Sequence, residues 1–197
     1  GLIVSEAERL TRLINQTLDL AKIESGRADW NGCELDLKEV IEQSIAATSQ
    51  LFREKGADVE LDLPDNPPLI LADRDRLIQV MLNLLSNAVK FLAPGSGRVR
   101  VVLQQLADGL EVSVADNGPG IRAEDQQLIF EKFRQVGDTM TAKPAGTGLG
   151  LPISRRIVEH FGGKLWVESV PGEGATFRFT LPFAPVRETA VAVAEGA

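Results

Sequence analysis

The chain of 197 residues has little cysteine, little histidine and no long apolar run. Its one cysteine, Cys33, excludes an internal disulfide, and we expect a reducing, cytoplasmic location. Its one histidine, His160, excludes a histidine-based metal cluster and a two-histidine catalytic device. No apolar run approaches the roughly 20 residues that span a bilayer. We therefore expect no membrane contact by this chain.

Basic side chains are also scarce: 21 Lys and Arg stand against 28 Asp and Glu, for a net charge of -7. No block of Lys and Arg marks a face for a phosphate-rich polymer, so we expect no nucleic-acid partner. The hydrophobic content of 44% is ordinary for a globular chain of this length. One domain with a short appendage is the expected organisation, since domains typically run to roughly 100–150 residues.

The chain opens with apolar residues that recur every three or four positions. They are Ile3, Ala7, Leu10, Ile14, Leu18 and Ala21, with Leu13 and Leu20 widening the stripe. This spacing predicts an amphipathic helix of about six or seven turns, which Ser25-Gly26 ends. No helix of equal length follows, so the stripe either packs on the next domain or pairs with a helix outside the chain. We favour pairing.

The rest of the chain alternates short strands with helices. Strands are predicted at 33–37, 59–63, 69–71, 98–106, 110–115, 164–169 and 176–181, and helices at 38–55, 73–92, 123–130 and 151–161. These elements predict an α+β fold in which helices form a layer on one face of an antiparallel-rich sheet. We place the domain boundaries at 1–29 for the first helix, 30–182 for the main domain and 183–197 for a linker or disordered tail.

Three groups of residues carry possible chemistry, the first on the helix at 73–92. Asn83, Asn87 and Lys90 share one face of it at steps of four and three. Amide oxygens suit a hard cation such as Mg²⁺, and a lysine one turn away suits the phosphate oxygens that this cation bridges. Taken alone, the same three residues also fit a solvated helix face.

The other two groups are glycine-rich. Asp116 ends a strand, where its carboxylate could accept a hydrogen bond from an exocyclic amine, and Gly118 and Gly120 would let the backbone approach a planar ring. A simple turn is the alternative. Further on, the run 146–150 opens a helix and could hold a triphosphate on glycines and helix N–H groups. It matches neither a Walker loop nor a dinucleotide-binding fingerprint.

In order along the chain, Asn83 to Asn87, Asp116 to Gly120, Phe130-Glu131-Lys132-Phe133 and Gly146 to Gly150 resemble the N, G1, F and G2 boxes of sensor histidine kinases. The resemblance covers about residues 8–181 and implies a Bergerat-type two-layer α/β sandwich. In that sandwich, helices cover one face of a mixed, mostly antiparallel sheet. The first helix resembles the second helix of the family's dimerisation and phosphotransfer hairpin, which implies a homodimer through this helix in the full-length protein.

The resemblance also implies roles for single residues. Asn87 would ligate Mg²⁺. Catalysis at the phosphates would be served by Asn83, Lys90 and Arg134. Asp116 would bind the adenine amino group of ATP in a pocket shaped by Gly118 and Gly120, with Thr176 as a further adenine contact. A lid between residues 134 and 147 would be anchored by Phe130 and Phe133. Gly146, Gly148 and Gly150 would hinge its exit over the phosphates. Thr147 and Leu149 of the same loop would also bind the nucleotide, and Lys143 would be a further phosphate contact.

The implied reaction is attack of a histidine on the γ-phosphate of ATP, followed by relay to an aspartate of a response-regulator receiver domain. ATP-hydrolysing relatives carry a glutamate where this chain has Asn83, and an amide cannot act as a general base. The family's acceptor histidine precedes the first helix of this chain, so we expect it outside these residues. His160 is expected to pack at a helix end instead.

Two alternatives stay open. A catalytically silent module that senses ATP or inhibits a partner kinase would share the fold, and degenerate lid glycines would favour it, whereas those of 146–150 are intact. A serine-phosphorylating relative would use the same fold against a partner protein. The long stripe of the first helix argues against that second alternative.

Overall fold

The structure is a computed structural model that describes residues 2–135 and 146–184. Its helices are α1 (Leu2–Glu24), α2 (Leu37–Lys55), α3 (Arg74–Phe91) and α4 (Gly150–His160), and two 3-10 turns are η1 (Ala123–Asp125) and η2 (Leu128–Phe130). Its strands are β1 (Gly32–Leu35), β2 (Asp58–Asp62), β3 (Ile70–Asp73), β4 (Arg98–Gln105), β5 (Gly109–Asp116), β6 (Lys164–Val170) and β7 (Gly174–Pro182). No helix in these ranges is long and apolar enough to cross a membrane.

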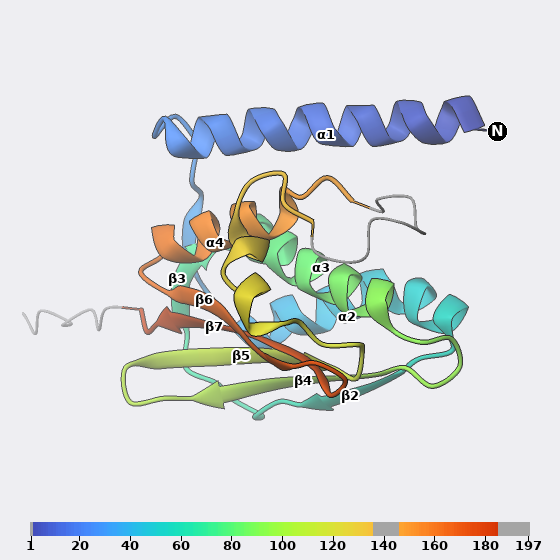
Figure 1. Ribbon diagram of the computed structural model, residues 1–197. Helices are drawn as coiled ribbons and strands as arrows, with labels where there is room; N and C mark the ends of the chain where they lie inside the picture. Colours follow the sequence, from blue (N-terminus) through green and yellow to red (C-terminus); the bar gives the residue numbers. More distant parts are fainter. Residues whose placement is uncertain (1, 136–145, 185–197) are drawn as a thin grey trace, which may run out of the picture.

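A five-stranded sheet in the order β2-β4-β5-β7-β6 forms one layer, and α2, α3 and α4 form the other (Figure 1). The β2–β4 pair is parallel and the remaining pairs are antiparallel, while β1 and β3 make a separate antiparallel pair. The predicted α+β sandwich with a mixed, mostly antiparallel sheet is confirmed. The loops that join these two layers at the end of β5 and the start of α4 carry the glycine-rich groups.

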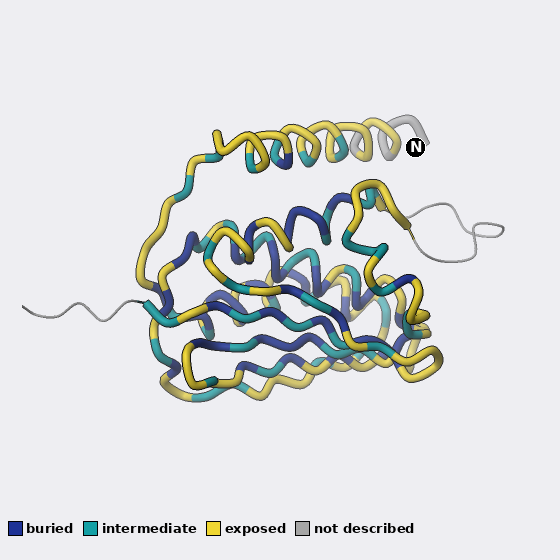
Figure 2. Tube along the Cα trace, turned by 60° about the vertical axis from the view of Figure 1, so that its left-hand side comes forward, coloured by how far each residue is buried: buried dark blue, intermediate teal, exposed yellow. Residues whose placement is uncertain are grey.

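The core lies between the sheet and its helices (Figure 2). Alternate residues of the central strands point into it, as period-two patterning requires. On β5 these are Leu110, Val112 and Val114, all fully buried, and on β7 they include Phe179. The opposite face of the sheet carries polar side chains such as Arg178, which pairs with Glu111 across the strands.

Local signals explain where the helices begin and end. The carboxylate of Asp73 accepts hydrogen bonds from the backbone N–H of Arg76 at 3.1 Å and of Asn31 at 2.8 Å, so it caps α3 and ties down the preceding loop. Gly56 ends α2 in the left-handed conformation, with φ of 61°. One prediction was wrong in kind: the helix expected at 123–130 is two separate 3-10 turns.

One side of α1 packs on the rest of the molecule. Leu20 is buried, and Leu13 and Ile23 lie half-buried against the core. The carboxylate of Asp19 accepts two hydrogen bonds from Arg76 on α3, at 2.7 and 2.8 Å, and both side chains are only 21% exposed. The ionic contact therefore sits in a largely shielded place, where it is worth more than a surface pair.

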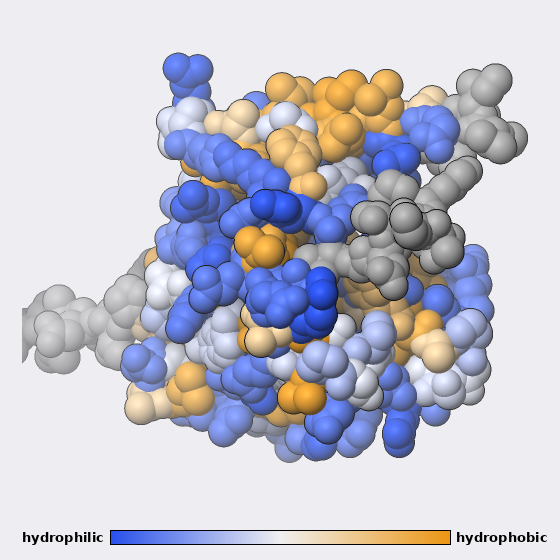
Figure 3. Space-filling model, in the orientation of Figure 1, coloured by the Kyte–Doolittle hydropathy of each residue, from blue (hydrophilic) through white to orange (hydrophobic). Residues whose placement is uncertain are grey.

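The other side of α1 is apolar and uncovered. Leu10, Ile14 and Leu18 are 57%, 51% and 57% exposed, and Figure 3 shows apolar side chains along the outward side of this helix. The apolar stripe predicted from the sequence thus divides into two faces of α1. Leu13 and Leu20 belong to the face that packs on the domain, and Leu10, Ile14 and Leu18 belong to the exposed face. Pairing of the exposed face with another helix stays a prediction.

Replacing Arg76 by alanine is expected to loosen α1 from the domain. Loss of a charge-assisted hydrogen bond costs about 1.5–3 kcal/mol, which corresponds to at least about tenfold faster hydrogen exchange of the α1 amides. Arg100→Ala is the matched control, because Arg100 pairs with Glu60 and Asp62 where all three side chains are more than half exposed. Equal exchange rates in the two variants would show that the Asp19–Arg76 contact does not hold the helix.

Candidate functional site

The polar face of α3 runs past the loop that opens α4. At its start, the side chain of Asn83 contacts Gly150, donating from Nδ2 to the Gly150 carbonyl oxygen at 3.2 Å. Two turns later, Lys90 Nζ would lie 3.5 Å from a Cβ placed on Gly146. Asn87 lies between these two contacts, one turn from each, and is half-buried. The structure therefore brings Asn83 and Lys90 to the glycine-rich loop, with Asn87 between them on α3, and the roles of these three residues stay predictions.

Asn87 and Lys90 have the character of ligands for a cation and an anion. The side chain of Asn87 makes no hydrogen bond to any residue that the structure describes, so its amide oxygen is available. Partial burial lowers the pKa of Lys90, because desolvation disfavours its charged form. An anion bound beside this ammonium group would favour the charge again.

Mg²⁺ fits this donor set only together with a phosphate ligand. Within residues 2–135 and 146–184, no group of three or more His, Cys, Asp or Glu side chains could hold a metal. Mg²⁺ usually keeps several waters and takes few protein ligands beside the phosphates of its substrate. Asn87 would supply such a protein oxygen, and the ion would neutralise charge on the triphosphate.

Asp116 ends β5 at the other side of the site. Its Oδ1 accepts a hydrogen bond from the backbone N–H of Gly118 at 2.8 Å. Burial raises the pKa of Asp116, and hydrogen bonds from the backbone of Gly118 and Ala175 partly offset the rise. An ionised carboxylate has about four lone-pair sites, so beside these two backbone hydrogen bonds the half-buried side chain can still accept one from a donor such as an amino group.

Gly118 has room for no side chain. A Cβ there would lie 2.7 Å from Asp116 Oδ1 and 3.3 Å from the carbonyl oxygen of Phe91, the last residue of α3. The turn after β5 therefore lies directly against the end of the helix that carries Asn87 and Lys90. This close approach joins the Asp116 group to the α3 group.

The loop of Gly120 is held by two residues that the sequence reading missed. Ser169 Oγ accepts from the N–H of Ile121 at 2.8 Å and donates to the carbonyl oxygen of Gly174 at 2.6 Å. Gln126 Nε2 donates to the carbonyl oxygens of both Ile121 and Ser169, at 3.1 and 2.8 Å. Nothing in the local sequence marks either residue, because these bonds join the loop after Gly120 to the β6–β7 hairpin, which is distant in the sequence.

Thr176 is not where the resemblance places it. In the register of β5 and β7, Thr176 is opposite Ala115 and Ala175 is opposite Asp116. Opposed residues point to the same face of a sheet and their neighbours to the other, so Thr176 faces away from Asp116. Ala175, which is buried, is the β7 residue beside the carboxylate. The expectation of an adenine contact at Thr176 is corrected by this register.

The loop from Gly146 to Gly150 leads into α4 as an anion site would. The first N–H groups of any α-helix have no acceptor within the helix, and no side chain caps the start of α4 to supply one. These N–H groups can therefore bind an anion. Leu149 is fully buried and anchors the loop. Thr147 Oγ1 donates to Gln16 Oε1 of α1 at 2.5 Å and accepts from the N–H of Leu149 at 3.3 Å.

The entry and exit of the predicted lid meet at Phe133 and Gly148. The N–H of Phe133 donates to the Gly148 carbonyl oxygen at 3.0 Å, and a Cβ on Gly148 would lie 2.9 Å from Phe133 Cα. Gly148 also has φ of 71°, which favours glycine. Phe133 anchors through its backbone, because its side chain is 59% exposed. The ring of Phe130 instead packs on the core and lies under Arg155.

Of the two phosphate contacts predicted in the lid, the structure describes Arg134 but not Lys143. Arg134 is exposed and pairs with Glu131 at 3.2 Å, so its role at the phosphates stays a prediction. Lys143 lies outside the described residues. His160, by contrast, stacks on Trp30 with ring centroids 3.7 Å apart and meets Phe161 edge-on, which confirms its predicted packing role.

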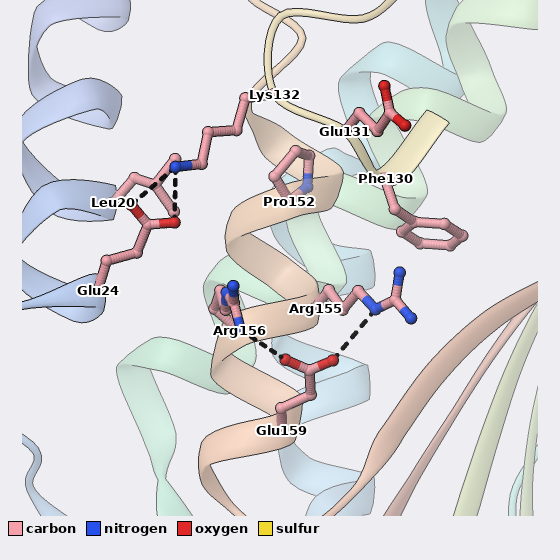
Figure 4. Close-up of a pocket in the computed structure, with 9 residues that line it drawn as sticks. All are labelled: Leu20, Glu24, Phe130, Glu131, Lys132, Pro152, Arg155, Arg156 and Glu159. Carbon is pink, nitrogen blue, oxygen red and sulfur yellow. Dashed lines mark hydrogen bonds and ion pairs between the residues drawn. The ribbon is translucent and has the colours of Figure 1, made fainter. Parts of the chain in front are cut away.

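A separate pocket of ≈570 Å³ lies between α1, α4 and the loop of η2 (Figure 4). Its charged groups are already paired: Lys132 bonds Glu24 at 2.7 Å, and Arg155 and Arg156 both bond Glu159. It includes none of the three predicted groups. We assign no ligand to it.

Comparison with known proteins decides the family. Residues 72–185, more than half of the chain, match the family described as histidine kinase-, DNA gyrase B-, and HSP90-like ATPase. The chain belongs to this family. Its fold and its glycine-rich groups are those of a sensor histidine kinase catalytic domain, and the similar proteins described below are sensor histidine kinases.

Curated relatives are sensor kinases. The chain is 39% identical over 182 residues to the adaptive-response sensory kinase SasA of Parasynechococcus marenigrum (strain WH8102), covering 88% of this chain and 46% of that protein. It is 34% identical over 192 residues to the sensor protein GacS of Pseudomonas syringae pv. syringae, covering 95% and 21%. The chain therefore spans less than half the length of these two relatives.

Solved histidine kinases share the fold. Full-length ShkA in complex with AMPPNP superposes with a TM-score of 0.80 at 32% identity, covering 91% of this chain and 37% of that one. The catalytic domain of histidine kinase ThkA gives 0.69 at 29% identity, covering 79% and 99%. ThkA in complex with the response regulator TrrA gives 0.74 at 26% identity, covering 94% and 51%.

Proposed function

We propose that this chain is the ATP-binding catalytic part of a two-component sensor histidine kinase. It holds ATP with Mg²⁺ and transfers the γ-phosphate to a histidine on a hairpin outside these residues, for relay to a receiver-domain aspartate. The observation that carries the proposal is the meeting of three groups along α3: Asn87 and Lys90, the loop at Gly146, and the Asp116 turn against Phe91. The AMPPNP complex of ShkA and the TrrA complex of ThkA support the nucleotide and the partner.

Each of these residues has a distinct task. Asp116 would accept a hydrogen bond from the adenine amino group, and the N–H groups at the start of α4 would hold phosphate oxygens. Lys90 would balance charge on the transferred group while Asn87 positions the cation. A P–N bond to the imidazole forms as the bond to the leaving β-phosphate oxygen breaks, and ADP leaves with that electron pair. The side chains of the chain thus bind and position, and none acts as a base on water.

Calorimetric titration tests nucleotide binding first. AMPPNP is expected to bind to this chain, more tightly with Mg²⁺ than without it, and more tightly than the corresponding guanine nucleotide. The adenine preference follows from Asp116, whose carboxylate only accepts hydrogen bonds. Adenine offers it an amino group, whereas guanine has a carbonyl oxygen at that position and no hydrogen to donate there. Failure of AMPPNP to bind under either condition would contradict the proposal.

Phosphotransfer is tested with labelled ATP. The chain alone is expected to gain no acid-labile phosphate, because His160 sits at the far end of α4, about 15 Å along the helix axis from Gly150. Addition of a kinase hairpin that carries an acceptor histidine is expected to give labelled hairpin. Acid-labile phosphate on His160 would contradict the assignment of the acceptor.

A further inference from the structure

The NH₂ group of the Asn83 side chain is engaged with α4. Its Nδ2 donates to the carbonyl oxygen of Gly150 at 3.2 Å and to Ser154 Oγ at 3.0 Å. Gly150 is the first residue of α4, and Ser154, which is fully buried, lies one turn further along. Both N–H bonds of this amide are therefore committed to the first turn of the helix that follows the glycine-rich loop.

The position requires a donor. A backbone carbonyl only accepts, so the group facing the Gly150 oxygen must carry hydrogen. Asparagine supplies two N–H groups, whereas a carboxylate of the same shape supplies none and would face the carbonyl with like partial charge. The amide at position 83 thus has a structural reason that is separate from its inability to activate water.

Gly150 lets the amide approach. A Cβ there would lie 3.3 Å from Asn83 Oδ1, which is tighter than most real Cβ contacts. The side chain of Asn83 accordingly fills the space beside Gly150. Ser154 completes the contact from the buried side, and without its oxygen one N–H of Asn83 would lose its acceptor.

We propose that Asn83 and Ser154 form a clamp that positions the phosphate-binding end of α4 against the α3 face of Asn87 and Lys90. In this role Asn83 is a positioning residue that touches neither the metal nor the phosphates. Ser154, on the buried side of α4, is its necessary partner. The inference rests on the proposed function, since it concerns how the ATP site is held together.

A double-mutant cycle tests the clamp. AMPPNP affinity would be measured for the wild type, Asn83→Ala, Ser154→Ala and the double variant, with and without Mg²⁺. We expect Asn83→Ala to weaken binding about tenfold and Ser154→Ala about fivefold, with the double variant no weaker than Asn83→Ala, because linked residues are not additive. The fold-losses are expected to be the same with and without Mg²⁺.

The Mg²⁺ comparison separates positioning from direct contact. Additive losses, or a loss at Asn83 confined to Mg²⁺ conditions, would overturn the clamp, because Asn83 would then act on the nucleotide or the metal itself. Ser44→Ala is the matched control: Ser44 is also fully buried in a helix, and among the described residues its hydroxyl bonds only the Val40 carbonyl of the same helix. Its affinity is expected to stay within twofold of wild type.

A second variant at position 83 controls for the case in which Asn83→Ala disturbs the fold. Asn83→Asp keeps the shape and removes both donors, so it is expected to weaken AMPPNP by about the same tenfold as Asn83→Ala. Wild-type affinity in Asn83→Asp would overturn the clamp. Lack of AMPPNP binding by the wild type would overturn both the clamp and the proposed function, whereas an additive cycle in a binding-competent chain would overturn the clamp alone.

Discussion

Asn87→Ala is expected to abolish most of the Mg²⁺-dependent gain in ATP affinity. Asn87 is the half-buried amide between the two contacts of α3 with the glycine-rich loop, and it is free of other hydrogen bonds within the described residues. No cluster of acidic or histidine ligands in those residues could replace it. We expect a loss of at least about tenfold in the presence of Mg²⁺, since metal sites lose about 10- to 100-fold even when only an outer partner is removed.

The informative quantity is the ratio of affinities with and without Mg²⁺. In Asn87→Ala this ratio is expected to fall close to one, while affinity without Mg²⁺ changes little. Ser86→Ala, at the exposed neighbouring position of α3, is the control and is expected to keep the wild-type ratio. A wild-type ratio in Asn87→Ala would remove this residue from the metal site.

Asp116→Asn is expected to weaken ATP binding by about 10- to 100-fold, the cost of a lost charge-assisted hydrogen bond. The N–H of Gly118 already donates to Oδ1, so in the variant the amide oxygen is held there and the –NH₂ group faces the base. Two donors then oppose each other at the adenine amine. Calorimetry with adenine and guanine nucleotides checks this result, and equal losses for both bases would contradict it.

The pH dependence of binding follows from the same carboxyl group. Because burial raises the pKa of Asp116, it takes up its proton at a higher pH than an ordinary aspartate. ATP affinity is expected to fall as the pH drops through this raised pKa. The free domain is expected to gain stability over the same window, because the folded state binds more protons than the unfolded one. Asp116→Asn should lack this step and keep only the dependence due to the nucleotide phosphates.

Most elements of the fold could be predicted because their signals are local. The cap at Asp73, the stop at Gly56 and the period-two strands β4 and β5 all depend on residues a few positions apart. The candidate site was likewise visible as an ordered set of short motifs. In the structure these motifs, far apart in the sequence, lie close together along α3.

The failures have a common cause in longer-range geometry. Thr176 lies one residue from the position beside Asp116, and one residue reverses the face of a strand. Sequence spacing placed Asn83 on a polar face of α3, yet the first turn of α4 lies against this position and bonds the amide. A signal was present at Ser154, since a serine beside Ile153 and Ile157 interrupts the apolar side of α4, but its partner could not be read from it.

By itself the sequence determined the family, most of the order of the helices and strands, and the three groups of residues to which we assign the proposed nucleotide site. Apolar periodicity and local capping and turn signals are sufficient for the helices and strands, and the ordered short motifs are sufficient for the family. Only the tertiary structure decided which face of β7 meets Asp116, which side of α1 is covered, and why position 83 carries an amide. All three features depend on strand register and helix packing. Both are stabilised by contacts between residues that folding brings together, rather than by contacts between neighbours in the chain.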